Sequence, residues 1–202
     1  MVDREIARTA PPFQPGHVLL FSGHMVDAPT RPRPRFPPAM VARATAEIER
    51  VLDGLKAGPG DIALTQGAAG GDLIFAEACI KRGVRMQLLL PLPEPDFIDA
   101  SVLPSSDGVA WRERYYALKA QLAEPARVMP VELGPLPADA NAFERCNLWL
   151  LYSALSYGPD KVRFVCLWDG AGGDGPGGTK HMVEEVKRRT GQVSWIDTRT
   201  LA

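Results

Sequence analysis

The chain lacks the features that would direct it to a membrane, out of the cell or onto nucleic acid. None of its apolar stretches approaches the ~20 residues that cross a bilayer. Residues 1–5 are charged and no apolar segment follows them, so no secretory signal is visible. With a net charge of −1 and a pI near 6.3, the chain has no basic footprint of a general nucleic-acid binder. We therefore expect a cytoplasmic protein with no membrane partner and no general nucleic-acid binding.

Cysteine is scarce, and several easily recognised catalytic motifs are absent. Cys79, Cys146 and Cys166 form neither a CxxC pair nor a metal-ligand spacing, and each lies within an apolar pattern. They are expected to be small buried hydrophobic residues in a reducing compartment. The chain contains no G-K-[ST], HExxH or G-x-S-x-G motif. No metal and no cofactor is assigned from these patterns.

The order of the apolar patterns favours an α/β fold. Runs typical of strands occupy residues 17–21, 61–65, 85–90, 128–133, 162–168 and 193–196. Helical spacing covers residues 39–56, 111–122 and 141–157, and also the stretches that lead from two glycine turns to residues 81 and 189. Residues 95–110 are expected to be a loop with one helical turn at 96–101, and the proline-rich residues 25–38 to be irregular. The alternation predicts a single Rossmann-like three-layer α/β/α domain over residues 17–202, after a flexible leader at residues 1–16, with a mostly parallel sheet of about six strands.

Two glycine-rich turns each follow a predicted strand and open a predicted helix. The first runs from Gly67 to Asp72, and the second spans residues 169–179. This layout points backbone N–H groups and the positive end of a helix at one spot, which suits an anion. In a parallel sheet both turns lie at the carboxyl ends of the strands, where ligands bind. The predicted phosphate or ligand site comprises Ser22, Gly23, Gly67, Ala68, Gly70, Gly71, Asp72, Asp169, Gly170, Asp174, Gly177, Gly178 and Thr179.

The carboxylates of these turns have more than one interpretation. Asp72 either caps the following helix or accepts hydrogen bonds from a ribose hydroxyl or an amine. Asp169 and Asp174 either bind Mg²⁺ through water or stabilise their own loop through turn hydrogen bonds. Neither turn has a spacing that dictates a metal site, so magnesium stays an open alternative.

Two histidines and three arginines complete the set of candidate residues. His24 ends the first strand and His181 lies in the first turn of the last helix, where each either acts as an acid/base group or is a polar loop residue. Arg31, Arg33 and Arg35 alternate with prolines, and they either clamp the anionic end of a ligand or form a solvated loop.

Three further side chains have structural as well as functional interpretations. Arg145 and Asn147 lie on the helix predicted over residues 141–157, and they either reach the site or pair at the surface. Trp168 either packs in the core or stacks on a base. The same tryptophan-containing helix can also form the interface of a homodimer.

These motifs together resemble the SLOG superfamily, which joins the DNA-processing protein A family to the Lonely-Guy phosphoribohydrolases. The resemblance rests on Ser22-Gly23-His24-Met25, on the turn from Gly67 to Asp72, and on residues 172–182, and it extends over residues 17–200. Residues 172–182 are similar to a bacterial branch of this superfamily. The resemblance implies a Rossmann-like fold whose glycine loops hold a nucleotide-derived ligand.

One departure from the Lonely-Guy pattern bears on catalysis. Those enzymes carry P-G-G-x-G-T-x-x-E, in which the final glutamate cleaves an N-glycosidic bond. In this chain Met182 stands three positions after Thr179, and Glu184 and Glu185 come later, so the glutamate is not matched. We therefore expect a nucleotide-binding or sensor module, with a phosphoribohydrolase-like hydrolase of nucleoside monophosphates as the alternative. The sequence leaves open whether the protein is an enzyme.

Overall fold

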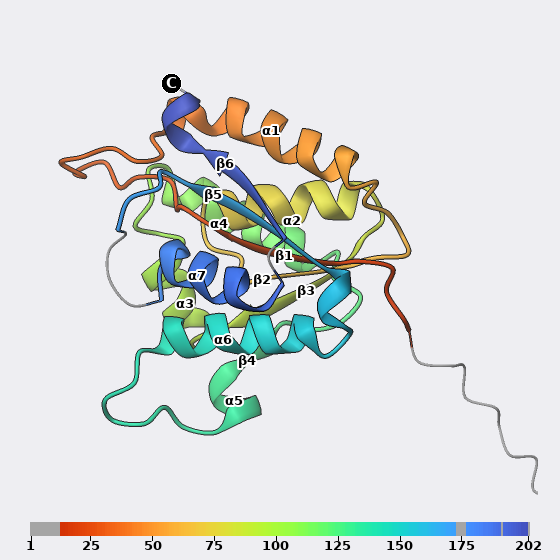
Figure 1. Cartoon of the computed structure of the whole chain (residues 1–202). Coiled ribbons are helices and arrows are strands. Elements are labelled where there is room, and N and C mark those ends of the chain that lie inside the picture. Colours follow the sequence, from red (N-terminus) through yellow and green to blue (C-terminus); the bar gives the residue numbers. More distant parts are fainter. Residues whose placement is uncertain (1–12, 173–176, 191, 202) are drawn as a thin grey trace, which may run out of the picture.

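The computed structural model describes residues 13–172, 177–190 and 192–201 of the chain (Figure 1). Its centre is a six-stranded sheet in the order β4-β3-β2-β1-β5-β6, in which every strand pair is parallel. The strands are β1 (Val18–Gly23), β2 (Ile62–Thr65), β3 (Arg85–Leu90), β4 (Arg127–Val128), β5 (Val162–Trp168) and β6 (Val193–Asp197). The predicted Rossmann-like α/β/α fold is confirmed.

Helices cover both faces of the sheet (Figure 1). One face carries α1, α2, α3 and α4, and the other carries α6 and α7. The α-helices are α1 (Val41–Gly54), α2 (Gly71–Lys81), α3 (Glu94–Ser101), α4 (Gly108–Lys119), α5 (Met129–Leu133), α6 (Ala142–Leu155) and α7 (Thr179–Arg189). Across the described residues, no helix is long and apolar enough to cross a bilayer.

The central strand β1 shows why the sequence builds two cores. Its side chains alternate between the faces, so Leu19 and Phe21 pack under α1 and α2, while Val18 and Leu20 pack under α6 and α7. All of these side chains are at most 1% exposed. A strand that is buried on both faces has a continuous apolar run in its sequence, which is typical of parallel strands. Burying each such side chain contributes about 1.5–3 kcal/mol before the entropic cost of ordering the chain.

The strand order places a crevice beside β1. The chain builds outward from β1 to β4 and then returns to β5 on the other side of β1. The register pairs Ser22 with Cys166 and Gly23 with Leu167, so β1 and β5 end together. The connections after these two strands lead to helices on opposite faces. Such a switch point is where open α/β sheets bind ligands.

Two predicted elements differ from the structure. The stretch predicted as a loop with one turn contains a complete helix, α3 (Glu94–Ser101), and α4 begins as early as Gly108. Pro95 fits the first turn of α3 because that position needs no N–H donor, and Glu94 lies at the positive end of the helix.

The strand predicted over residues 128–133 is also wrong. Only Arg127–Val128 pair with β3, and Met129–Leu133 form the helix α5. Pro130 explains the difference, because proline cannot donate to a strand ladder but is tolerated at the start of a helix.

Part of the predicted leader contacts the domain. The guanidinium of Arg85 lies 3.8 Å from the ring centre of Phe13, and the Gly16 N–H donates to the Gly60 carbonyl over 2.8 Å. Residues 1–12 lie outside the described part of the chain.

Candidate functional site

A cavity of about 340 Å³ opens at the carboxyl ends of the central strands. This volume falls within the range of about 300–1,000 Å³ typical of small-molecule sites. The structure brings both glycine turns to it, together with the end of β1 and part of α6. Its walls include Phe21, Ser22, Gly23, His24, Arg31, Arg35, Gln66, Ala68, Asp72, Phe143, Asn147, Trp168, Gly177, Gly178 and Thr179.

The first glycine turn is joined to the segment after β1. The Gly71 N–H donates to the His24 carbonyl over 3.1 Å, and the Val26 N–H donates to the Ala69 carbonyl over 3.1 Å. Gly70 adopts a φ of 105°, and a Cβ there would lie 2.6 Å from the Val26 nitrogen. Glycine is therefore required at this close approach between two loops.

Asp72 accepts hydrogen bonds from two backbone N–H groups of its own turn. One of its carboxylate oxygens, Oδ2, accepts the N–H of Gly67 over 3.1 Å and the N–H of Ala68 over 3.4 Å. The helix α2 receives no side-chain cap, so Asp72 closes the turn rather than capping the helix. These two amide hydrogens are therefore turned toward a protein carboxylate and not toward a ligand anion. Burial raises the pKa of Asp72 to about 6, against the lowering effect of the Thr65 hydroxyl and of nearby backbone amides.

The second glycine turn presents the amino end of α7 to the cavity. Gly178 is the residue before the helix and provides no side-chain cap, whereas Asn141 caps α6 by accepting the N–H groups of Phe143 and Glu144. The Thr179 hydroxyl receives a hydrogen bond of 3.4 Å from the Ser22 hydroxyl across the cavity wall. An uncapped helix start combines open N–H donors with the positive end of the helix dipole.

Asn147 connects the two turns. Its side-chain oxygen accepts the Gln66 amide over 2.9 Å, and its side-chain nitrogen donates to the Gly177 carbonyl over 2.6 Å. The side chain is buried and sits on α6, in the middle of an apolar helix. Of the two outcomes expected for Arg145 and Asn147, Asn147 reaches the site, while Arg145 binds the carbonyls of Leu133, Gly134 and Pro135. A polar amide among buried apolar neighbours was the signal available in the sequence.

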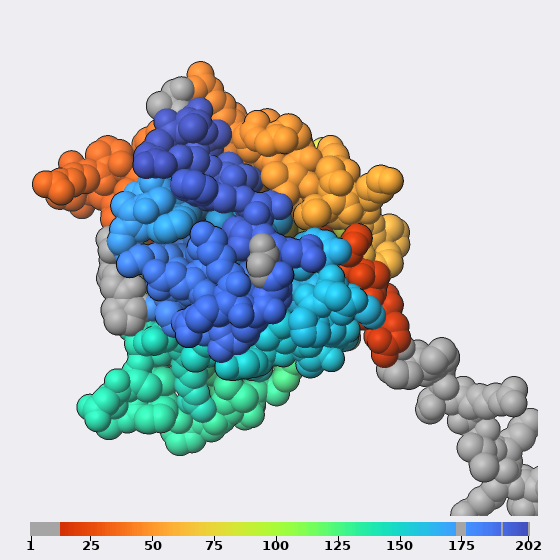
Figure 2. Space-filling view, viewed as in Figure 1, coloured from red at the N-terminus to blue at the C-terminus, as the bar shows by residue number. Residues whose placement is uncertain are grey.

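The proline-rich segment forms an arm, residues 27–36, that projects beside the cavity (Figure 2). Buried Asp27 closes its base by accepting the N–H groups of Arg35 and Phe36 over 2.8 and 2.9 Å. Arg31 and Arg35 line the cavity, and the Arg31 Nε lies 3.3 Å from the Asp27 carboxylate. Arg33 is exposed and lines a separate shallow hollow on the arm. Sequence reasoning singled out the arginines but missed Asp27, whose position before a proline-rich loop was the only hint.

His24 and Asp169 meet between the ends of β1 and β5. The His24 Nε2 lies 3.2 Å from both the backbone nitrogen and the carboxylate of Asp169. Burial lowers the pKa of His24, and Arg35 lowers it further, while Asp169 opposes both. The neutral ring is thus favoured, with Nε2 accepting the Asp169 N–H. Burial acts to raise the pKa of Asp169, but the Ala171 N–H and His24 outweigh it and the net shift is downward.

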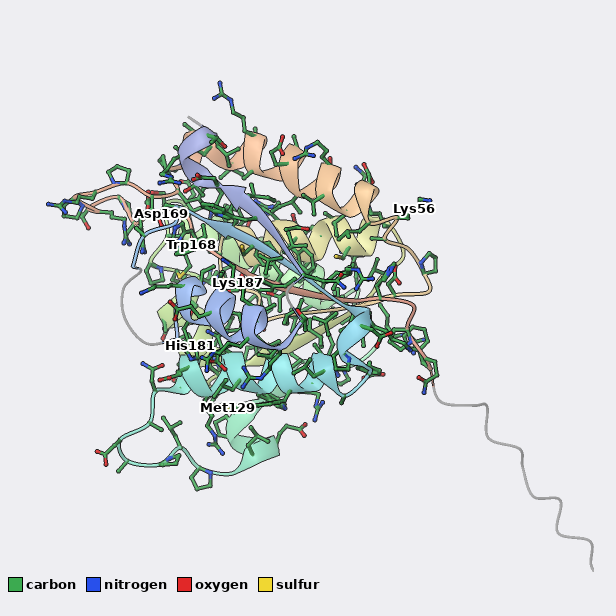
Figure 3. All side chains as sticks on the ribbon, viewed as in Figure 1. Lys56, Met129, Trp168, Asp169, His181 and Lys187 are labelled. Carbon is green, nitrogen blue, oxygen red and sulfur yellow. The ribbon has the colours of Figure 1, made fainter. Side chains whose placement is uncertain are left out.

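His181 lies away from the cavity walls. It sits between α7 and α6, with its Nε2 3.6 Å from the Glu144 carboxylate (Figure 3). Of the two glutamates that follow it, Glu184 is exposed beside Lys180, and buried Glu185 pairs with Arg189 over 2.6 Å. None of these three α7 side chains lines the cavity.

The remaining predicted residues lie around the second turn. Asp169 and Gly170 line a neighbouring cavity of about 330 Å³ that shares Arg35 with the first. Trp168 lines the main cavity, and its ring nitrogen donates to the Ala171 carbonyl over 2.9 Å. Asp174 lies outside the described residues, and among those that are described no three His, Cys, Asp or Glu side chains group as metal ligands.

Comparison with known proteins leaves the family open. No family model matches the chain, and no curated protein sequence matches it. Among solved structures, the chain is similar to the Moco carrier protein from Chlamydomonas reinhardtii, with 16% identity over 91% of each chain and a TM-score of 0.36. Values at this level assign neither a family nor a ligand. The SLOG resemblance and the expected homodimer stay predictions.

Proposed function

We propose that the protein binds a phosphate-bearing small molecule derived from a nucleotide and acts as a sensor or binding module. The proposal rests on the amino end of α7, which no side chain of the described residues caps and which opens onto a cavity that Arg31 and Arg35 also line. In this proposal the phosphate lies at Gly178 and Thr179. Charge-assisted hydrogen bonds of this kind contribute about 1.5–3 kcal/mol each, and the helix dipole adds about 0.3–1 kcal/mol.

The apolar part of the cavity supports a ligand with a flat or hydrophobic portion. Phe21, Phe143 and Trp168 contribute aromatic surface to the same cavity as the cationic side chains. Small-molecule sites typically combine an apolar lining with a few fixed polar groups, which is the balance found in this cavity. A base or another ring would pack against these side chains while the phosphate is held at α7.

A hydrolase acting on the N-glycosidic bond of a nucleoside monophosphate is the second candidate, and one observation favours it. The Asp72 carboxyl lines the cavity, and its pKa of about 6 suits proton transfer near neutral pH. Against it, the α7 glutamates point elsewhere and His181 does not line the cavity. The binding role therefore has the stronger support.

A thermal-shift and calorimetry panel of nucleoside monophosphates, diphosphates, cyclic nucleotides and inorganic phosphate tests both candidates. We expect at least one nucleotide to raise the Tm and to be recovered unchanged, because binding to the folded state alone stabilises it. Release of free base and ribose 5-phosphate would instead favour the hydrolase. If no member raises the Tm at millimolar concentration, both candidates are wrong. Arg31→Ala and Arg35→Ala test whether these two arginines contribute to binding. Arg50→Ala, which alters an exposed arginine of α1, is their matched control.

A further inference from the structure

Asp72 places an almost buried carboxylate on the wall of the cavity. The residue is 6% exposed, and its oxygen Oδ2 accepts the two amides of its own turn. The other groups of the described residues that lower its pKa, the Thr65 hydroxyl and the Gln66 backbone N–H, are neutral donors. A carboxylate has about four acceptor sites, so that of Asp72 can accept a further hydrogen bond from a ligand.

The same carboxylate has no counter-charge among the residues that the structure describes. Within the described ranges, no lysine, arginine or histidine forms an ion pair with Asp72, and the cavity-lining Arg31 pairs with Asp27. Buried charges in proteins are normally paired, because removing an ion from water is costly. The raised pKa of Asp72 reflects that cost, and a carboxyl with a pKa of about 6 is still largely ionised at pH 7.

Gln66 adds a second acceptor beside it. Its side-chain nitrogen donates to Asn147, which turns the amide carbonyl to a cavity-lining position without a hydrogen bond among the described residues. Gln66 directly precedes the turn that Asp72 closes, and its backbone N–H is near enough to lower the pKa of Asp72. The Asp72 carboxylate and the Gln66 amide therefore both line this cavity.

We propose that Asp72 and Gln66 form a subsite for the protonated amine or amidine of the ligand, so that the cavity takes a molecule with a phosphate at one end and a cationic nitrogen at the other. This inference rests on the proposed phosphate site at α7. A cation supplies the counter-charge that Asp72 lacks, whereas a neutral hydroxyl supplies only a hydrogen bond. The low dielectric of a buried site strengthens the attraction.

The test is a calorimetric comparison of aminoethyl, aminopropyl and aminobutyl phosphate with ethyl, propyl and butyl phosphate. We expect at least one aminoalkyl phosphate to bind about tenfold more tightly than the alkyl phosphate of equal length. In Asp72→Asn the preference should fall to about twofold or less, because asparagine still accepts the two turn amides but carries no charge. Asp53→Asn, which alters an exposed carboxylate of α1, should keep the full preference.

Each alternative outcome has a distinct meaning. Equal binding of amino and alkyl phosphates overturns the cation subsite and leaves the phosphate site intact, whereas no binding of any phosphate overturns both. Equal binding of hydroxyalkyl and aminoalkyl phosphates replaces the cation by a hydroxyl and also overturns the inference. If Asp72→Asn fails to fold, the wild-type protein is used instead. Its preference for the aminoalkyl phosphate over the alkyl phosphate should fall as the pH drops below about 6, and a constant preference would contradict the proposal.

Discussion

The side-chain nitrogen of Asn147 lies 2.6 Å from the carbonyl oxygen of Gly177, in a partly buried hydrogen bond between α6 and the second glycine turn. The carbonyl and the N–H of a trans peptide point in opposite directions. Holding the Gly177 carbonyl against α6 therefore turns the N–H of Gly178 away from α6. Because Gly178 lines the cavity, we infer that Asn147 orients this N–H for an anion.

Replacing Asn147 by alanine should weaken phosphate binding and the fold together. The change leaves the Gly177 carbonyl and the Gln66 amide without their partner, which costs about 1–3 kcal/mol in the free energy of unfolding. We expect calorimetry to show about tenfold weaker binding of the best nucleotide. Asn141→Ala removes the cap of α6 and should cost about 1 kcal/mol without changing the affinity. Equal affinities in the two variants would show that Asn147 has no orienting role.

Placing a carboxylate before α7 should separate helix stability from anion binding. Gly178 has φ −75° and ψ 173°, a conformation suited to a capping side chain, so Gly178→Asp should raise the free energy of unfolding by roughly a few tenths of a kcal/mol through the cap and by about 0.3–1 kcal/mol through the helix dipole. The new charge would repel a phosphate, and we expect its affinity to fall by about 100-fold. Gly178→Ser caps the helix without a charge and is the matched control. Phosphate binding that survives in the aspartate variant would move the anion site away from α7.

Glycine at position 70 should be indispensable. A Cβ would approach the Val26 nitrogen to 2.6 Å, and the φ of 105° is unfavourable for any other residue. Gly70→Ala should therefore lower the free energy of unfolding by about 2 kcal/mol or more in urea titrations. Gly54→Ala at the end of α1 meets no atom within 4 Å and should leave stability unchanged or raise it slightly.

The sequence was sufficient for most of the fold because its main strands are apolar runs and two of its helices, α2 and α7, begin at recognisable glycine turns. β3 (Arg85–Leu90) and β5 (Val162–Trp168) were predicted at their observed bounds. The sequence predicted only one helical turn of α3 and missed α5, because each helix begins at a proline within a short segment, where proline signals a break as readily as a helix start. Their helical state depends on packing that periodicity does not reveal.

The base of the arm should control its exposure to protease. Trypsin cleaves poorly before proline, so Arg31 and Arg33 resist it and the Arg35–Phe36 bond is the sensitive one. In the native protein Phe36 is 0% exposed and its N–H is held by Asp27. Asp27→Ala should open this bond to trypsin while Asp53→Ala leaves it protected, with the fragments identified by mass spectrometry. Resistance of the Asp27 variant at a temperature where it is folded would contradict the role of Asp27.

The lowered pKa of His24 predicts how stability depends on pH. The unfolded chain, with a histidine pKa of about 6.5, takes up the proton more readily than the folded protein does. The stabilisation is therefore complete above about pH 6.5 and is lost as the pH falls below it, at no more than about 1.4 kcal/mol per pH unit. Asp72 acts in the opposite direction, because its raised pKa lets the folded state bind a proton first between about pH 6 and 4.

A single variant isolates the histidine contribution. His24→Gln should flatten the dependence of the free energy of unfolding between about pH 5 and 7, and the wild-type minus variant difference should rise with pH across that range. Urea titrations at each pH measure it. A difference that does not change with pH would show that His24 titrates alike in both states.

The candidate site was predicted less completely than the fold. The meeting of the two turns followed from the topology, since they come after β2 and β5, the two strands that flank β1 in one parallel sheet. What the sequence could not provide was the direction of each group: Asp72 turns back to Gly67, and His181 turns to Glu144. The direction of Asp72 is set by the hydrogen bonds within its own turn, and that of His181 by a contact between α7 and α6, and neither contact can be seen in the sequence.

The proline content of the arm bears on how tightly a ligand is bound. Pro29, Pro32 and Pro34 each fix one backbone torsion, and Asp27 closes the loop at its base. A mobile loop loses conformational entropy when it binds a ligand. In this arm much of that entropy is already lost when the protein folds. Replacing these three prolines by glycine would leave the residues that line the cavity unchanged and would still weaken ligand binding.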